Sequence, residues 1–544
     1  MRRSLLAALL LFLAPATWAQ KFRSDDPLRV DPDDLEVAKP GEMELSTTWD
    51  VIEHSFWHRP GGRIPAASNV NTLGEVPDSS WFQNRIGVRD MSIEELVRGP
   101  NTTGGPAPGT WTVIGGKTQG ITPGFTVRDA KGDVYFVKFD PAPYPNLSTA
   151  ADVIVTRFFH AFGYFVPENY VAYLRPEQLE ISKDAKVRDR GRKERRPMTH
   201  ADVDAALSRV AHLPDGRVRC VASLRLSGQP LGPHKYWGTR SDDPNDAFPH
   251  EQRRDLRGYR VFSAWLNHDD SRSVNSLDMF VKTEGEQGWV KHYLIDFSSS
   301  LGSGSDATRR IAPQNPRAGN EYILERAPIL KTAASLGLWE RPWRRVEYTI
   351  YPEVGRIEAD FFQPQAWKPE YPNPAFERMQ PADAFWAARI VSRFSDDAVR
   401  ALVHSGEFTD PAAEKHLADM LIRRRDKIVA HYFREMNPLA EFQVAGLPDA
   451  PEIAFENLGE RAGLGKAEAY DYEWFVLENR TGRLDPLPAR GAAAEPRVAL
   501  PPGSHSYVML RLRGRGGPPG WKKSVDVYVR REGMPAIVGL EREE

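Results

Sequence analysis

Residues 265–304 constrain the fold of this chain more than any other stretch. Residues 276–283 alternate between apolar and polar side chains, residues 289–295 are apolar and aromatic, and the glycines of residues 285–288 supply a turn between them. These two runs predict an antiparallel β-hairpin. In such a hairpin the start of the first strand pairs with the end of the second, so residues that are distant in sequence meet at one end.

The predicted hairpin brings three polar side chains to the same end. Asn275 stands just before the first strand and Asp296 ends the second, so folding places an amide oxygen near a carboxylate. Asp270 lies five residues before Asn275, on the loop that enters the hairpin. Oxygen ligands suit Mg²⁺, and a carboxylate beside metal-held phosphates can act as a base. We therefore expect Asn275 and Asp296 to bind Mg²⁺ and Asp270 to be the catalytic residue.

This pattern resembles the catalytic and metal-binding segments of the protein-kinase-like superfamily. In that superfamily an Asp-x-x-x-x-Asn motif is followed by a hairpin that leads to Asp-Phe-Gly; the corresponding residues here are 270–275 and Asp-Phe-Ser at 296–298. His-Asp-Asp at 268–270 stands where ordinary protein kinases have His-Arg-Asp. In this respect the chain is similar to the atypical branches: the HipA-like, the phosphoinositide-kinase-like, and the secreted spore-coat or Golgi-type kinases.

Three strands are predicted upstream of the hairpin. We expect them at residues 111–114, 125–129 and 135–139. The connection between the first two, residues 115–124, is rich in glycine, and Gly116 and Gly120 could let backbone N–H groups approach a phosphate of the nucleotide. The alternative is an ordinary glycine-rich hairpin loop.

Lys138 belongs to the third of these strands, which is apolar on both faces. A lysine there either reaches solvent from a sheet edge or meets an anionic partner, because an unpaired buried ammonium is costly. The kinase-like resemblance implies that Lys138 holds the α- and β-phosphates of ATP. Asp152, on a helix predicted at 148–162, could be its ion-pair partner; alternatively Thr149 and Asp152 form a capping box.

The rest of the chain divides into regions by composition and pattern. We expect a signal peptide at 1–19, a loop-rich extension at 20–110, a β-rich N-lobe at 111–235 with a basic insertion at 176–213, an α-helical C-lobe at 236–436, and an antiparallel β-sandwich-like domain at 437–544. With the resemblance, the expected fold class is α+β: a bilobal protein-kinase-like fold followed by a C-terminal antiparallel β-domain.

Periodic patterns predict further elements in these regions. Helices are expected at 250–266, 384–393, 396–405 and 410–433, and C-terminal strands at 472–477, 506–513, 524–530 and 536–540. Aromatic side chains such as Trp49, Phe56, Trp57, Trp81 and Phe82 indicate that the N-terminal extension packs onto the main body. We expect the basic run at 183–196 to be a solvated insertion. Residues 298–317, rich in Ser, Gly and Pro, resemble a mobile activation-type segment.

The first residues indicate export. Arg2 and Arg3 precede an apolar core at 5–13, and cleavage is expected near Ala19, which predicts a periplasmic or extracellular protein. The apolar core is too short for a stable span, and no later stretch reaches the length of a membrane helix. The single cysteine, Cys220, excludes an intramolecular disulfide, and an exported protein without disulfides fits a bacterial envelope best. Cys220 itself is expected in a buried strand. A net charge of −2 gives no reason to expect nucleic acid as a partner.

The resemblance covers residues 111–436 and implies a function. It predicts an exported, ATP- and Mg²⁺-dependent phosphotransferase that acts on an unknown protein or envelope polymer; the same site could serve nucleotidyl transfer. The alternative is a catalytically inactive kinase-like scaffold or binding protein of the cell envelope, which the serine at 298 and the short acidic side chain of Asp152 favour. The histidines show neither HExxH nor clustered spacing, so no zinc site is expected.

Overall fold

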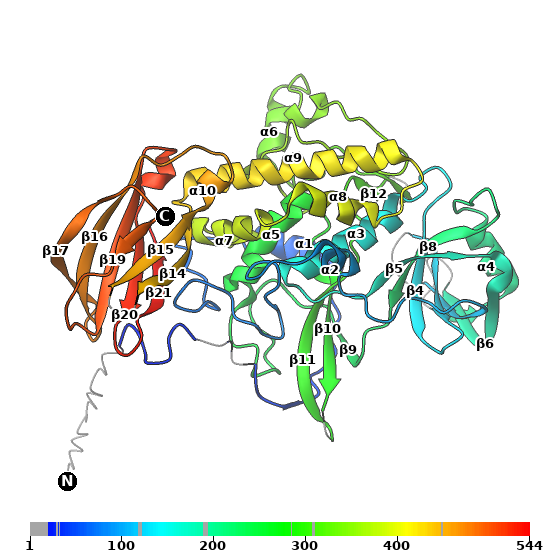
Figure 1. Ribbon diagram of the computed structural model, residues 1–544. Coiled ribbons are helices and arrows are strands. Elements are labelled where there is room, and N and C mark those ends of the chain that lie inside the picture. The colour runs from blue at the N-terminus through cyan, green and yellow to red at the C-terminus, as the bar shows by residue number, and fades with distance from the viewer. Residues whose placement is uncertain are drawn as a thin grey trace, which may run out of the picture.

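The computed structural model describes residues 20–28, 31, 33–117, 122–188, 194–283, 285–306, 310–447 and 450–544. The predicted signal peptide and Gly120 lie outside these residues. The described chain is a mixed α+β protein with several sheets (Figure 1). Helices occupy the middle of the molecule, a seven-stranded sheet lies at one end and the C-terminal sheets at the other. None of the described helices is long and apolar enough to cross a membrane.

The seven-stranded sheet contains the three strands predicted upstream of the hairpin. Its strands are β2 (Trp111–Gly116), β3 (Gly124–Arg128), β4 (Val134–Phe139), β5 (Asn169–Leu174), β6 (Leu179–Arg188), β7 (Arg195–Pro197) and β8 (Val218–Leu224). They are ordered β5-β8-β4-β3-β2-β6-β7, and all neighbours are antiparallel except β2 and β6. The helix α3 (Leu147–Phe162) connects β4 to β5, and α4 (His200–Leu207) precedes β8.

The two faces of β4 differ in burial, although both carry apolar side chains. Tyr135, Val137 and Phe139 are buried in a hydrophobic cluster with residues of α4, whereas Phe136 is exposed. Lys138 is on the same face as Phe136 because successive side chains of a strand alternate. The second face therefore leaves room for a charged side chain. Cys220 is buried in β8, as predicted.

The basic run forms more regular structure than the solvated insertion that the sequence predicts. Residues Leu179–Arg188 form β6, which extends the sheet in parallel pairing with β2. Ala185 is buried while Lys183 and Lys186 are exposed, so both charges stay in contact with solvent. The helix α4 follows this region, with Thr199 as its N-cap.

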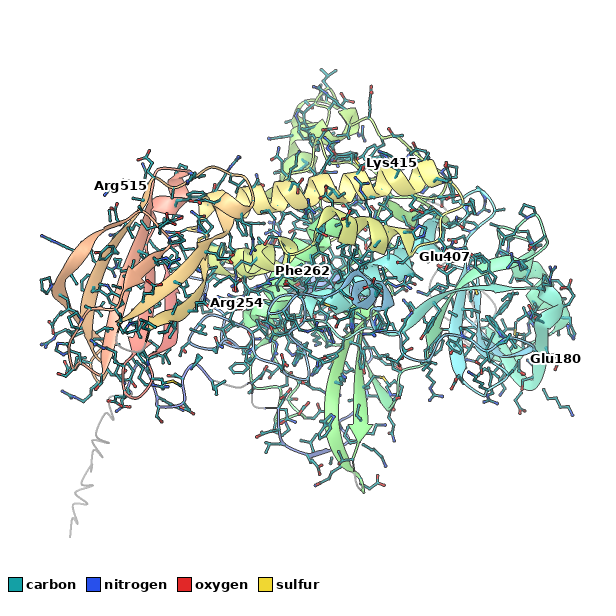
Figure 2. All side chains as sticks on the ribbon, in the orientation of Figure 1. Glu180, Arg254, Phe262, Glu407, Lys415 and Arg515 are labelled. Atoms are coloured by element: carbon teal, nitrogen blue, oxygen red, sulfur yellow. The ribbon has the colours of Figure 1, made fainter. Side chains whose placement is uncertain are left out.

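Four long helices and α3 share the largest hydrophobic core. They are α5 (Arg254–Leu266), α7 (Pro381–Val391), α8 (Asp396–His404) and α9 (Pro411–Glu435), which confirms the four predicted helices with shifted boundaries. The first begins at Arg254 rather than at residue 250, because His250–Gln252 forms a separate 3₁₀ turn. Figure 2 shows Phe262 inside this helical body and Glu180 on the seven-stranded sheet, far from Arg515 in the C-terminal sheets.

The predicted hairpin is confirmed and belongs to a second sheet. Its strands are β10 (Ser276–Lys282) and β11 (Gln287–Leu294), flanked by β9 (Gln229–Gly232) and β1 (Val37–Ala38) in the order β1-β11-β10-β9. Ser276 pairs with Leu294, and the backbone N–H of Ile295 donates to the carbonyl of Asn275 at 3.0 Å. Strand pairing therefore brings Asn275 next to the segment that carries Asp296.

The segment after the hairpin differs from the loop that the sequence predicts at 298–317. Its described part forms two short paired strands, β12 (Ser303–Ser305) and β13 (Ile311–Pro313). Ser300 and Ser303 in this segment are fully buried. The next helix, α6 (Arg326–Ala334), buries none of its residues.

The N-terminal extension packs onto the body through only part of its predicted aromatic set. Trp81 and Phe82 are buried in the helical core, as expected. Trp49, Phe56 and Trp57 are exposed, so the prediction was wrong for them; they lie on or directly after α1 (Thr47–Phe56), which places them on its solvent side. The extension also contains α2 (Ile93–Arg98).

The C-terminal region contains two antiparallel sheets. The first has the order β14-β15-β18 and the second β17-β16-β19-β20-β21. The strands are β14 (Leu439–Leu447), β15 (Ala450–Asn457), β16 (Ala469–Glu478), β17 (Arg483–Ala493), β18 (Arg497–Ala499), β19 (Tyr507–Arg515), β20 (Val525–Arg530) and β21 (Ala536–Arg542), with α10 (Leu458–Arg461) between β15 and β16. Both sheets bury side chains in one cluster, separate from the helical core.

Candidate active site

A lysine and two carboxylates meet where the seven-stranded sheet faces the hairpin. The ammonium of Lys138 lies 2.9 Å from Asp152 Oδ2 and 2.8 Å from Asp296 Oδ1. The three residues come from β4, from α3 and from the segment that follows β11, so the contact depends on the arrangement of all three elements. The ion pair that the sequence predicts between Lys138 and Asp152 is therefore present, and Asp296 joins it.

Asp152 is held by further hydrogen bonds inside the protein. Its Oδ1 accepts from the backbone N–H of Phe297 at 3.2 Å and from Asn169 Nδ2 at 3.2 Å. The capping box proposed as the alternative for Asp152 is absent. Asp140 caps α3 instead, because its Oδ1 accepts from the backbone N–H groups of Ser148 and Thr149 at 2.8 and 3.0 Å.

Asp296 is presented by an unusual backbone conformation. Its φ of +60° lies in the left-handed region, which Asp tolerates better than most residues because its short polar side chain can bond locally. The hydroxyl of Ser298 donates to Asp296 Oδ1 at 2.6 Å, the same oxygen that Lys138 contacts. No hydrogen bond or ion pair engages Asp296 Oδ2 within the part of the chain that the structure describes, and 39% of this side chain is exposed.

The charges of this cluster depend on one another. Burial alone would lower the pKa of Lys138, but the charges and hydrogen bonds of Asp152 and Asp296 outweigh it and raise the pKa. Burial likewise opposes ionisation of Asp296, yet the nearby ammonium groups of Lys138 and Lys117 hold its pKa below the usual range. Burial raises the pKa of Asp152. Lys138 and Asp296 therefore carry opposite charges at neutral pH.

Sequence reasoning missed Lys117 as a member of this site. It directly follows β2, its backbone N–H donates to the carbonyl of Gly124 at 3.1 Å, and its charge interacts with those of Lys138, Asp152 and Asp296. Burial and the neighbouring Lys138 lower the pKa of Lys117 to about 8. The sequence offers no signal for this, because the contact arises only when β3 and β4 fold beside it.

Asp270 lies on the loop between α5 and the hairpin. Its carboxylate forms an ion pair with Arg272, which also lies 3.3 Å from Glu370 Oε2, and its backbone carbonyl accepts from Asn275 Nδ2 at 2.7 Å. Burial raises the pKa of Asp270 to about 6; Arg272 opposes this rise, and the charges of Glu370 and Asp296 add to it. Asp270 is therefore ionised at neutral pH and can still accept a proton.

The loop of Asp270 is anchored by buried neighbours. His268 Nδ1 and the hydroxyl of Ser300 lie 2.9 Å apart, and burial lowers the pKa of His268 to about 4, so this imidazole is neutral. Asp269 Oδ1 accepts from Gln314 Nε2 at 2.9 Å. These contacts attach the loop to the segment that follows Asp296.

The predicted metal ligands approach each other through the backbone. Asn275 and Asp296 are brought near by the hydrogen bond between Ile295 and Asn275, while no hydrogen bond joins their side chains within the described ranges. Since Asn275 Nδ2 donates to Asp270, its amide oxygen is the atom available to a cation. Both residues thus offer an oxygen of the kind that Mg²⁺ prefers.

Gly116 has a packing requirement of its own. It is buried at the end of β2, opposite Phe125 of β3, and a Cβ at this position would lie 2.9 Å from Val187 Cγ2 of β6. The lack of a side chain at Gly116 is therefore explained by the close approach of β6. Its predicted role at a phosphate stays a prediction.

A second polar cluster contains His234, Asp278 and His292, all buried. Their potential ligand atoms lie within 4.8 Å of one another, so the three side chains could hold a metal ion, and nitrogen and oxygen donors suit zinc. In the present arrangement Asp278 Oδ1 lies 3.1 Å from His234 Nδ1 and 2.7 Å from His292 Nδ1, while Arg240 lies 3.3 Å from Oδ2. Asp278 thus already has partners on both oxygens.

The spacing of the histidines in the sequence gives no indication of this cluster, and the expectation that the chain has no zinc site stays a prediction. Asp278 and His292 occupy opposite positions of the hairpin, and the ring of Trp81 stacks on His292 at 3.6 Å between centroids. Strand pairing and a distant tryptophan create the cluster, so residue spacing alone could not reveal it.

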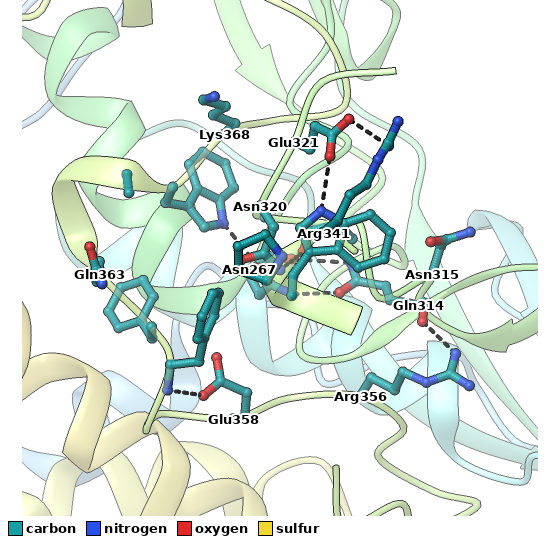
Figure 3. A pocket seen from close by; sticks show the side chains of 18 of the residues that line it. Asn267, Gln314, Asn315, Asn320, Glu321, Arg341, Arg356, Glu358, Gln363 and Lys368 are labelled. Atoms are coloured by element: carbon teal, nitrogen blue, oxygen red, sulfur yellow. Dashed lines mark hydrogen bonds and ion pairs between the residues drawn. The ribbon is translucent and has the colours of Figure 1, made fainter. Parts of the chain in front are cut away.

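A cavity of about 250 Å³ opens beside the Asp270 loop (Figure 3). Asn267 and Gln314 line it and are joined by a hydrogen bond of 2.6 Å from Asn267 Nδ2 to Gln314 Oε1. On another wall Glu321 accepts from Arg341 at 2.6 Å and from the indole N–H of Trp343 at 2.9 Å. Because Gln314 also holds Asp269, the cavity shares a wall with the loop that carries Asp270.

Comparison of the chain with protein-family models, with curated proteins and with solved structures finds no match.

Proposed function

We propose that this protein is an exported Mg²⁺- and ATP-dependent phosphotransferase of the protein-kinase-like type, acting on a hydroxyl group of a protein or envelope polymer. The observation that carries the proposal is the contact of Lys138 with both Asp152 and Asp296. A lysine of the third strand of a sheet, paired with an acid on the following helix and placed beside a metal-binding acid, is the arrangement that protein kinases use around the phosphates of ATP.

The finer fold that we propose is bilobal. The sheet that carries Lys138 would form a β-rich N-lobe. The helical body, whose core also takes up the apolar face of α3, would form the C-lobe together with the Asp270 loop and the hairpin. The separate hydrophobic clusters of the sheet and of the helices support this division. The two C-terminal sheets, which share a third cluster, would form a sandwich-like binding or stabilising module.

The residues have distinct roles in this proposal. The free oxygens of Asn275 and Asp296 would bind Mg²⁺, which neutralises charge on the phosphates of ATP. Lys138, kept in place by Asp152, would contact the phosphates when Asp296 turns toward the metal. Asp270 would accept the proton of the acceptor's hydroxyl group. The oxygen of that hydroxyl would attack the γ-phosphorus of ATP, and the bond between the γ-phosphorus and ADP would break.

Calorimetry with Mg·ATP tests the proposal. The wild-type protein should bind Mg·ATP, and Asp296→Asn should abolish Mg²⁺-dependent binding because it removes an anionic metal ligand. The fold should remain intact, because Asp296 is partly exposed and Lys138 keeps Asp152 as its partner. Asp204→Asn, an exposed aspartate of α4 remote from the site, is the matched control and should bind as the wild type does. Wild-type protein that binds no Mg·ATP contradicts the proposal.

One observation favours a second candidate, a kinase-like scaffold that binds but does not turn over nucleotide. Arg272 forms an ion pair with Asp270, so the proposed base is engaged. Binding of Mg·ATP without any consumption of ATP in the presence of cell-envelope extracts would favour this second function.

A further inference from the structure

The ammonium of Lys117 stands in the proposed phosphate site without a partner of its own. Within the described residues no hydrogen bond or ion pair engages its side chain, although its charge interacts with those of Lys138, Asp152 and Asp296. The side chain is partly buried. A partly desolvated ammonium gains most from an anionic ligand when no neighbouring carboxylate already neutralises it.

The position of the Lys117 side chain is determined by Gly124. Gly124 pairs with Lys138 across β3 and β4, and a Cβ on Gly124 would lie 3.4 Å from Lys117 Cδ. The side chain of Lys117 therefore runs alongside Gly124, next to the position of Lys138 in the neighbouring strand. A Cβ on Gly124 would also lie 2.2 Å from the carbonyl oxygen of Val137, so the backbone at this point leaves no room for another side chain.

The charges of the cluster explain why a second lysine matters. Lys138 lies between two carboxylates, Asp152 and Asp296, so one positive charge faces two negative ones. With Lys117 included, the cluster has two positive and two negative side chains, so its formal net charge is zero. A site that must hold several phosphate groups needs this additional positive charge, because a Lys138 that stays bound to Asp152 offers a phosphate little net attraction.

We propose that Lys117 is a second cationic contact for the phosphate chain of the nucleotide, and that it makes the site selective for ligands with two or more linked phosphates. This inference rests on the proposed function and adds to it a residue that determines specificity. Lys138 lies in β4 and Lys117 directly follows β2, on the two sides of β3 in one sheet, so they can bind different phosphate groups of the same chain.

The test compares affinities of the full chain for ligands of different phosphate number. Calorimetry with Mg·ATP, Mg·ADP, AMP and inorganic tripolyphosphate is done for the wild type, Lys117→Met, Lys117→Arg and Lys131→Met. Lys131 is an exposed lysine in the turn between β3 and β4 and serves as the control. Thermal unfolding of each variant checks that the protein is folded.

Lys117→Met should weaken Mg·ATP and tripolyphosphate binding about ten- to a hundredfold and AMP binding much less, as expected for the loss of one charge-assisted contact. Lys117→Arg should retain most of the affinity, and Lys131→Met all of it. If Lys117→Met binds Mg·ATP as the wild type does, or weakens ATP and AMP equally, the inference is overturned while the proposed function stands. If wild-type protein binds none of the four ligands, the proposed function itself fails.

Discussion

Replacing Asp270 by Asn should stabilise the folded protein at neutral pH while it abolishes turnover. Burial is the main reason that the pKa of this carboxyl rises from an ordinary 3.8 to about 6. Since the folded protein ionises Asp270 less readily than the unfolded chain does, the charge destabilises the fold at pH 7 by about 3 kcal/mol. Only 18% of the side chain is exposed, so solvent screens little of this effect. Asn has nearly the same shape and carries no charge, and Arg272 keeps Glu370 as a partner.

The expected gain depends on pH in a defined direction. Below about pH 4 the carboxyl is protonated in both the folded and the unfolded wild type, so Asp and Asn behave alike and the gain disappears. Between about pH 4 and pH 6 the gain grows as pH rises, and above this window it reaches its full value. A carboxyl whose pKa is raised in the folded state thus stabilises the fold relatively more at low pH, and this contribution is lost as pH increases.

Chemical unfolding followed by circular dichroism at pH 7.5 and at pH 4.5 measures this difference, and ATP consumption measures turnover. Asp204→Asn is the control, because it removes an exposed carboxylate of α4 and should change neither quantity. An Asp270→Asn variant that is no more stable than the wild type at pH 7.5 would refute the reasoning. So would a gain in stability that does not shrink at the lower pH.

Three further substitutions test contacts that support the sites. Asp152→Ala should lower the free energy of unfolding by about 3 kcal/mol, because it breaks a buried ion pair and leaves Asp296 as the remaining partner of Lys138. The same substitution should weaken Mg·ATP binding. Chemical denaturation measures the first effect and calorimetry the second. Asp278→Asn should lower stability by about 3 kcal/mol, since Arg240 then loses its buried charge partner, and unchanged stability would contradict this. Asp140→Ala should lower the melting temperature through the loss of a helix cap worth about 1–2 kcal/mol.

The elements that the sequence predicts well are those defined by local patterns. Alternation and a glycine turn predict the hairpin of β10 and β11, and helical periodicity predicts the four long helices. The pairing of Lys138 with Asp152 could also be predicted, because a buried lysine needs an anionic partner and Asp152 lies on the helix predicted to follow the strand. Each of these inferences needs only neighbouring residues.

The residues that sequence reasoning missed depend on distant parts of the chain. Lys117 joins the site because β3 and β4 fold beside it, and the pairing of Asp278 with His292 exists only in the folded hairpin. Arg272 is only two residues from Asp270, but its second partner, Glu370, comes from a loop about one hundred residues later. Residue type and spacing carry no signal for such contacts.

Some strands were missed because their sequences break the usual rules. The strand β17 contains Pro486 and Pro488, which argue against a strand in the interior of a sheet. It forms an edge of the five-stranded sheet, where an absent N–H group leaves no neighbour unpaired. In β6 only Leu179 and Ala185 are buried, so the strand has too few buried positions to give an alternating apolar pattern in the sequence.

A crystal structure of the full chain with Mg²⁺ and a non-hydrolysable ATP analogue tests the central claim most directly. The account predicts a metal ion bound by the side-chain oxygens of Asn275 and Asp296, and phosphates within hydrogen-bond distance of Lys138 and Lys117. Asp270 should face the γ-phosphate without contacting the metal. Crystals grown at saturating analogue that show no ligand at this site, or a metal ion bound elsewhere with Lys138 unchanged between its two carboxylates, would contradict the account.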